Sequence, residues 1–162
     1  MNKLEKRMYV FVPYNISPIQ QAIQAGHAVE QYAYLHGRNE EYIDYVKNWK
    51  TWIILNGGTT NSNRALGTGE SEGSLNQITD SLEDNGIIHA VFNEPDLNNA
   101  LTAVCFLADE RVFNYKDYPD WNGSKWWNKN TNVEPFYSKW VKKLGGDKNL
   151  FLRDLLKYKK LA

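Results

Sequence analysis

Residues 8–28 of the chain, MYVFVPYNISPIQQAIQAGHA, decide the fold. The stretch begins with a continuous apolar, β-prone run, which is typical of a central strand covered on both faces. Pro13 ends this run. Ser17 then has the features of a helix N-cap, with Pro18 at the first helical position and Gln20 at the capping-box position. The stretch therefore predicts a buried strand, a short turn and a long helix.

The alternation of strands and helices continues along the chain. We expect strands at residues 8–12, 52–55, 87–92 and 101–107, and helices at residues 17–36, 40–49, 74–86, 109–114, 136–144 and 148–160. This order predicts an α/β fold, a three-layer sandwich around a four-stranded sheet. The loop between the last two strands is too short for a helical crossover, so these strands should pair antiparallel and make the sheet mixed.

Apolar spacing predicts the buried faces of the helices. In the first helix, the residues expected to face the core are Ile19, Ile23, Val29 and Tyr32. Ser74 and Gln77 have the spacing of a second capping box, which should start the helix after the second strand.

The composition fits one domain with a single core, because the chain has 162 residues. Its formal net charge of zero argues against binding to long duplex nucleic acid, which usually needs a basic surplus. The charge is uneven, since residues 138–162 contain eight Lys and Arg against two Asp, a charge of +6. This basic end is either a solvated helical face or a contact for an anion or an RNA end.

The single cysteine, Cys105, lies in an apolar run and is expected to be buried, which leaves no disulfide and no cysteine-based metal site. His27, His36 and His89 lie on different predicted elements without metal-ligand spacing, so we expect no metal and no other cofactor. No apolar stretch has the length of a membrane span, and residues 1–10 lack a signal-peptide pattern. These features predict a cytoplasmic protein without a membrane partner.

Residues 8–107 resemble the type 2 peptidyl-tRNA hydrolases (the PTH2 family) of archaea and eukaryotes. The family's first helix carries the motif A-x-Q-x-x-H-A, which matches Ala22, Gln24, His27 and Ala28. Its later loop, D-A-G-x-T-Q, corresponds to residues 94–99, EPDLNN. The resemblance implies a PTH2-like domain over residues 1–107, with residues 108–162 as a C-terminal aromatic and helical extension packed on the same domain.

The resemblance also implies a reaction, the hydrolysis of the ester between a peptide and the tRNA 3′ end by a lysine ammonium and a carboxylate. Here Gln20 stands in place of the family's lysine. The loss of one oxyanion donor typically costs on the order of 10²–10³ in rate. Glu94 and Asp96 remain as candidate catalytic carboxylates, and Lys50 and Arg64 are candidate replacement cations.

Polar residues around the first helix and the loops are candidate ligand-binding residues. His27 either lines a pocket or is a partly buried helix residue bonded to the backbone. Gln20 either faces a ligand or only caps the helix, and the two carboxylates of the 94–99 loop either serve the site or make local turn bonds. The candidates are Asn15, Ser17, Gln20, Gln24, His27, Thr59 and Asn98.

Tryptophans are concentrated near the C-terminal end, at Trp121, Trp126, Trp127 and Trp140. These rings either stack a nucleic-acid base or attach an irregular segment to the core.

Three functions agree with these features. The first is a binding protein with degraded hydrolase chemistry that holds a nucleotide or a tRNA 3′ end. Residues 94–103 are also similar to PTH2-like proteins of tailed bacteriophages, which implies an anti-defence protein that sequesters a host nucleotide signal in the host cytoplasm. The second is an active peptidyl-tRNA hydrolase. The third is a homo-oligomeric or host-protein interaction module formed by residues 108–162.

Overall fold

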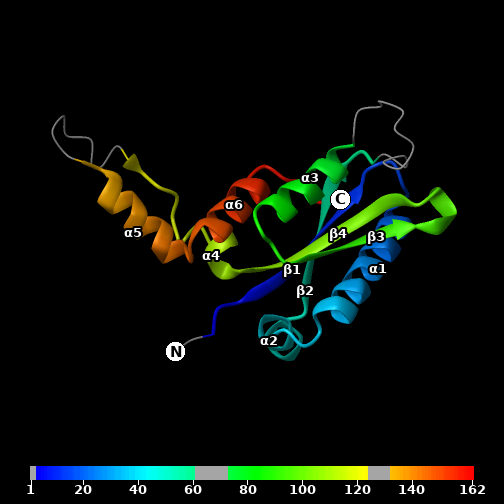
Figure 1. Cartoon of the computed structure of the whole chain (residues 1–162), viewed down its shortest axis with the longest axis horizontal. Coiled ribbons are helices and arrows are strands. Elements are labelled where there is room, and N and C mark those ends of the chain that lie inside the picture. The colour runs from blue at the N-terminus through cyan, green and yellow to red at the C-terminus, as the bar shows by residue number, and fades with distance from the viewer. Residues whose placement is uncertain (1–2, 61–72, 124–131) are drawn as a thin grey trace.

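The chain forms an α/β structure, and the computed structural model describes residues 3–60, 73–123 and 132–162 (Figure 1). The strands are β1 (Lys6–Pro13), β2 (Thr51–Gly58), β3 (His89–Glu94) and β4 (Ala100–Asp109). The helices are α1 (Pro18–His36), α2 (Glu40–Asn48), α3 (Ser74–Asp84), α4 (Glu110–Phe113), α5 (Glu134–Leu144) and α6 (Asp147–Leu156), with a 3-10 turn η2 (Pro95–Leu97). None of the described helices has the length and apolar character needed to cross a membrane.

The strands make one mixed sheet in the order β2-β1-β4-β3. β1 and β2 run parallel, whereas β4 is antiparallel to both β1 and β3. The predictions of a four-stranded mixed sheet and of antiparallel final strands are confirmed.

Helices cover both faces of this sheet (Figure 1). On one face, α1 and α2 pack against Met8, Val10 and Val12. On the other face, α3, α4 and α6 pack against Tyr9 and Phe11. Because successive strand residues point to opposite faces, burial on both sides explains why the β1 sequence is a continuous apolar run.

α1 lies along β3 and starts beyond its end. Gln24 contacts Glu94, the last residue of β3, while His36 Nε2 lies 3.0 Å from the carbonyl oxygen of His89, the first residue of β3. The turns of α1 that precede Gln24 therefore extend past this edge strand.

The burial pattern of α1 corrects one prediction from the sequence. Ile19 and Ile23 do not face the core: they are 71% and 48% exposed, because they lie on the side of α1 away from the buried stripe of Gln24, Ala25, Ala28, Val29 and Tyr32. Val29, farther along the helix, is buried as predicted. The contact with the sheet is made instead by Ala25 and Ala28, whose small side chains are fully buried.

The predicted cap of α1 is confirmed. The Gln20 backbone N–H donates to Ser17 Oγ at 3.4 Å, and Gln20 Oε1 accepts from the Ser17 backbone N–H at 3.1 Å. The Gln20 amide oxygen is thus occupied by the capping box.

The second predicted cap is wrong, because the N-cap of α3 is Gly73 and Ser74 is the first helical residue. The Ser74 hydroxyl instead donates to the Gly57 carbonyl oxygen at 2.8 Å and accepts from the Thr59 N–H at 2.9 Å. A Cβ at Gly73 would lie 2.5 Å from the Thr59 carbonyl oxygen. The close approach of β2 to the start of α3 therefore requires glycine at the cap.

Arg153 connects α6 to the segment that follows α4. Its side chain is 1% exposed and donates to Asp120 Oδ1 at 3.0 Å, to the Arg111 carbonyl oxygen at 2.9 Å and to the carbonyl oxygen of Tyr118. The neighbouring Leu152 lies in the core cluster beneath α3. This end of the chain therefore shares the core of the sheet.

α5 extends away from the sheet (Figure 1) and is held by aromatic contacts. The ring of Trp121 lies 5.5 Å from that of Tyr137 and 5.9 Å from that of Trp140. Trp140 Nε1 donates to the Pro119 carbonyl oxygen at 3.0 Å. These contacts favour the attachment role for the described rings, while Trp126 and Trp127 lie outside the described residues.

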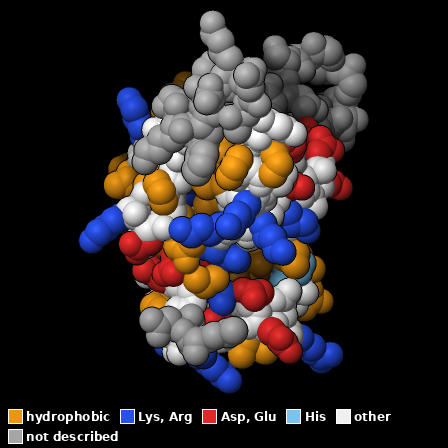
Figure 2. Space-filling model, turned by 90° about the vertical axis from the view of Figure 1, so that its left-hand side faces the viewer, with side chains coloured by type: hydrophobic (Ala, Val, Ile, Leu, Met, Phe, Trp, Pro, Cys, Tyr) orange, Lys and Arg blue, Asp and Glu red, His pale blue; other side chains and the backbone are white. Residues whose placement is uncertain are grey.

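The surface at the α5 end mixes lysines with hydrophobic side chains (Figure 2). A hollow of about 600 Å³ lies between Trp121, Phe136 and Trp140. Three lysines of α5 line the same hollow: Lys139, Lys142 and Lys143.

Candidate functional site

The first helix and the acidic turn meet where α1 passes the end of β3. Gln24 Nε2 donates to Glu94 Oε2 at 2.6 Å, although the two residues are 70 positions apart in the chain. Gln24 is only 7% exposed. The structure thus brings together two of the candidate residues, one for ligand binding and one for catalysis.

Thr102, on the adjacent strand β4, completes a line of three polar groups. Its hydroxyl donates to Gln24 Oε1 at 2.6 Å, and the residue is 1% exposed. Because the hydroxyl donates to the amide oxygen, the Gln24 NH₂ group must face Glu94. Sequence reasoning did not select Thr102, whose one signal is a hydroxyl within the apolar run of β4.

Glu94 lies at the open end of this line and also begins the η2 turn. Its Oε1 accepts from the Asp96 backbone N–H at 3.4 Å. Within residues 3–60, 73–123 and 132–162, neither Glu94 nor Asp96 forms an ion pair with a lysine or arginine. The exposed Asp96 side chain makes no described contact with α1, so Glu94 alone connects the acidic turn to the helix.

His27 lies one turn after Gln24 and packs on β3. Its ring is 4.5 Å from the ring of Phe92, and its Nδ1 is buried with no hydrogen-bond partner in the described part of the chain. Of the two alternatives for His27, the bond to the backbone is therefore not observed at Nδ1. Buried polar atoms without a partner are uncommon, and a water or a ligand often accounts for them.

None of the remaining candidates makes a described hydrogen bond to Glu94. Asn15 is exposed in the turn after β1, and Asn98 is an exposed left-handed residue with φ of 52° that ends η2. Thr59 follows β2, at the far edge of the sheet from β3, where its hydroxyl accepts from the Ser74 N–H at 3.3 Å. Ser17 and Gln20 cap α1. The cap uses the Ser17 hydroxyl and the Gln20 amide oxygen, whereas the Gln20 NH₂ group makes no described hydrogen bond.

Lys50, one of the two candidate replacement cations, does not supply a charge at Glu94. Lys50 precedes β2, whose first residue pairs with Arg7 near the start of β1. Glu94 lies at the other end of the sheet, beside the start of β4. Arg64 lies outside the described residues.

The buried thiol offers no nucleophile. Cys105 is fully buried as predicted, and burial raises the pKa of its thiol to about 12. Among the described residues, no group of three or more His, Cys, Asp and Glu side chains is arranged to hold a metal ion.

No protein-family model matches the chain, and no curated protein is significantly similar to it. What the site can do must therefore follow from its own geometry.

That geometry fixes a carboxylate beside α1. Thr102 orients Gln24, and Gln24 in turn holds Glu94, so the carboxylate is positioned to accept hydrogen bonds from the hydroxyl or amino groups of a ligand. Ile19 and Ile23 are exposed on the same helix and offer apolar surface to a flat or aliphatic group.

Proposed function

We propose that the protein binds the 3′ end of an RNA, or a nucleotide, at the Gln24–Glu94 site without hydrolysing it. One observation carries this proposal. A carboxylate is held by a line of hydrogen bonds from Thr102 and Gln24, and no described lysine or arginine pairs with it.

The charge of the site favours an RNA 3′ end over the phosphate of a nucleotide. Phosphates bind to cations and N–H donors, whereas Glu94 is an acceptor and repels a phosphate. The terminal ribose of an RNA 3′ end presents two neighbouring hydroxyls and no further phosphate. These hydroxyls can donate to Glu94, while the terminal base lies over the exposed side chains of Ile19 and Ile23.

The same features argue against hydrolysis. Ester cleavage needs stabilisation of a developing oxyanion, and Gln20 supplies an uncharged amide where the family that the chain resembles has a lysine. The amide oxygen of Gln20 is occupied by the Ser17 cap. Its NH₂ group can still donate a hydrogen bond to a ligand, which suits recognition.

The resemblance to the PTH2 family gains support from the fold. The mixed four-stranded sheet has helices on both faces, and two of the motif residues, Gln24 and His27, lie beside the end of β3.

A turnover assay with N-blocked peptidyl-tRNA distinguishes binding from hydrolysis. We expect the unmodified protein to bind deacylated tRNA without cleaving peptidyl-tRNA. Gln20→Lys should gain measurable turnover, because it restores the ammonium, whereas Gln21→Lys, one position farther along α1, should not. Cleavage by the unmodified protein that Glu94→Gln abolishes would instead establish the hydrolase.

The α5 surface favours a second function, contact with another protein. Phe136 is 39% exposed beside the hollow that Trp121 and Trp140 line. The three lysines around this hollow would repel their counterparts in a second copy, so an acidic partner fits better than self-association. A sedimentation experiment tests this point. Self-association would appear as a molecular mass that rises with protein concentration in the unmodified protein and stays at that of one chain in Phe136→Asp.

A further inference from the structure

A second hollow lies at the opposite end of the sheet from Glu94, and its volume is about 200 Å³. The first residue of β3, His89, pairs with Phe106 of β4, so residues 107–109 of β4 have no partner in β3. The hollow opens beside these three residues. Ala108, which lines the hollow, is six residues along β4 from Thr102, about 20 Å at the rise of a strand. The hollow is therefore separate from the Gln24–Glu94 site.

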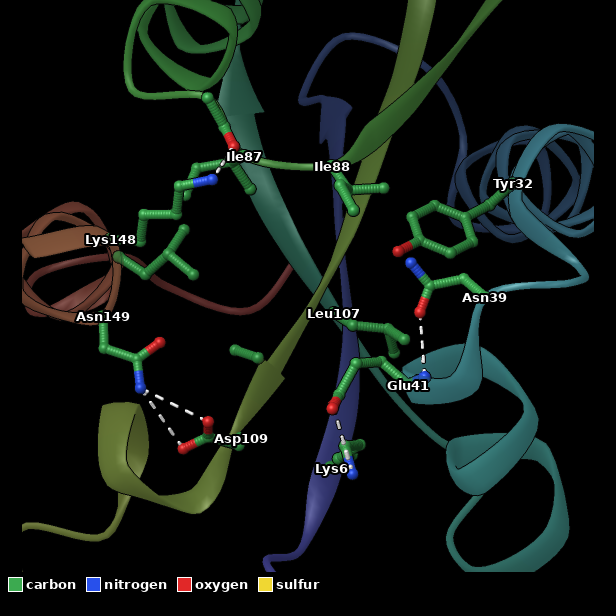
Figure 3. A pocket seen from close by; sticks show the side chains of 13 residues that line it. Lys6, Tyr32, Asn39, Glu41, Ile87, Ile88, Leu107, Asp109, Lys148 and Asn149 are labelled. Atoms are coloured by element: carbon green, nitrogen blue, oxygen red, sulfur yellow. Dashed lines mark hydrogen bonds and ion pairs between the residues drawn. The ribbon is translucent and has the colours of Figure 1, made fainter. Parts of the chain in front are cut away.

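Figure 3 shows that two different helix layers form the walls of the hollow. Lys148 and Asn149 approach from α6 on one side. Tyr32 of α1 and Asn39, the N-cap of α2, face them from the other side. Leu107 of β4 lies between the walls, and the hollow thus has polar walls around an apolar floor.

The Tyr32 hydroxyl is the feature that indicates a ligand. Tyr32 is 2% exposed, its hydroxyl points into the hollow (Figure 3), and it makes no hydrogen bond within the described residues. Burial raises the pKa of Tyr32, so the phenol keeps its proton at neutral pH. The side chain is held rigidly by burial, while its hydroxyl oxygen is open to the hollow, where a water or a ligand can bond to it.

The unpaired charge in the hollow is positive. Asp109 is paired with Arg111 at 2.6 Å, and Glu41 with Lys6 at 3.2 Å. The Lys148 ammonium donates to a backbone carbonyl oxygen at 2.6 Å and forms no ion pair in the described parts of the chain. Since an ammonium has three donors, it can bind an anion and keep this bond.

We propose that the hollow binds a small aromatic carboxylate. Its ring lies on the apolar floor formed by Leu107 and Ile88, its carboxylate meets Lys148, and a polar group at its far end bonds to the Tyr32 hydroxyl and the Asn39 amide. Sites for drug-sized ligands measure about 300–1,000 Å³, so the smaller hollow suits a single substituted ring.

The test is a titration with 4-hydroxyphenylacetate, followed by the methyl NMR signals of the protein. We expect saturable shifts at Ile87, Ile88, Leu107 and Leu152, which all line the hollow. The neutral 4-hydroxyphenylacetamide should bind at least about tenfold more weakly, because it lacks the charge that Lys148 recognises. Absence of saturable shifts, or equal binding of the acid and the amide, would overturn the proposal.

Two variants separate a specific site from general packing. Tyr32→Phe keeps the ring and removes only the hydroxyl, so the protein should remain folded and bind the acid about fivefold or more weakly. Lys116→Gln, which removes an exposed lysine that lines neither hollow, should bind unchanged. Full affinity in Tyr32→Phe would overturn the proposal. RNA binding at Glu94 should be the same in both variants, so the proposal for the hollow and the proposal for the Gln24–Glu94 site are tested independently.

Discussion

Gln24 Nε2 and Glu94 Oε2 lie 2.6 Å apart and join the first helix to the turn before the last strand. Thr102 fixes the orientation of this amide from beneath, at 2.6 Å from Gln24 Oε1. The three groups form a directed line, in which each donor faces an acceptor and the negative charge stands at the open end. This arrangement positions an acceptor for a ligand, and it provides no described cation for an oxyanion.

Thr102→Val should lower the free energy of unfolding by about 1–2 kcal/mol, because Gln24 Oε1 then loses its donor while remaining buried. Urea denaturation measures this loss. Thr79→Val is the matched control, since its hydroxyl is also buried but bonds only to Leu75 within α3. An equal loss in both variants would show that the line to Glu94 has no special role in stability.

Ile19→Gln should leave the free energy of unfolding within about 0.5 kcal/mol of that of the unmodified protein, because Ile19 is 71% exposed. The same change should weaken RNA binding, since the proposal places the terminal base over the exposed Ile19 and Ile23. Denaturation and RNA titration on one sample measure both effects. Marked destabilisation would mean that the side chain is buried after all.

Arg153→Met should destabilise the protein by about 2–4 kcal/mol, because two backbone carbonyls and Asp120 lose a buried donor. Lys157→Met removes the other, more exposed partner of Asp120 and should cost less than about 1 kcal/mol. Thermal denaturation of the pair gives the comparison. Similar losses in both variants would contradict the anchoring role of Arg153.

Alkaline pH should destabilise the protein between about pH 10 and 12. Burial raises the pKa of Tyr9 and of Tyr45 to about 12, whereas an unfolded tyrosine titrates near pH 10. Between these values the unfolded chain has released protons that the folded chain retains, so the stability falls as the pH rises. Each unit by which the pKa in the folded chain exceeds that in the unfolded chain corresponds to about 1.4 kcal/mol of the free energy of unfolding.

Urea midpoints measured at pH 8, 10 and 11.5 test this dependence. Tyr9→Phe should flatten the decline. Tyr34→Phe, which alters a tyrosine that is 85% exposed, should leave it unchanged. A midpoint that stays constant up to pH 11.5 in the unmodified protein would refute the expectation.

The features predicted correctly from the sequence are local ones. The apolar run of β1, the Ser17–Gln20 capping box and the short β3–β4 connection are each set by neighbouring residues. The burial of Ile19 was predicted wrongly because α1 packs through its small residues Ala25 and Ala28, and the larger isoleucines lie on the opposite side.

The contacts that make the two sites are long-range, and this limits what the sequence can predict. The acidic turn and Gln24 were selected through the family resemblance, but Thr102 contacts Gln24 across 78 positions and gives no periodic signal. The hollow between Tyr32 and Lys148 likewise requires α1, α6, β4 and the start of α2 to meet at the end of the sheet.

The most direct test of the proposed function is a calorimetric titration with the trinucleotide CCA, once with a free 3′ hydroxyl and once with a 3′ phosphate. We predict saturable binding of the free form and at least about tenfold weaker binding of the phosphorylated form, because the added charge meets Glu94. In Glu94→Gln this preference should shrink. Equal affinity for the two trinucleotides, or no binding of either one, would contradict the recognition of an RNA 3′ end at this carboxylate.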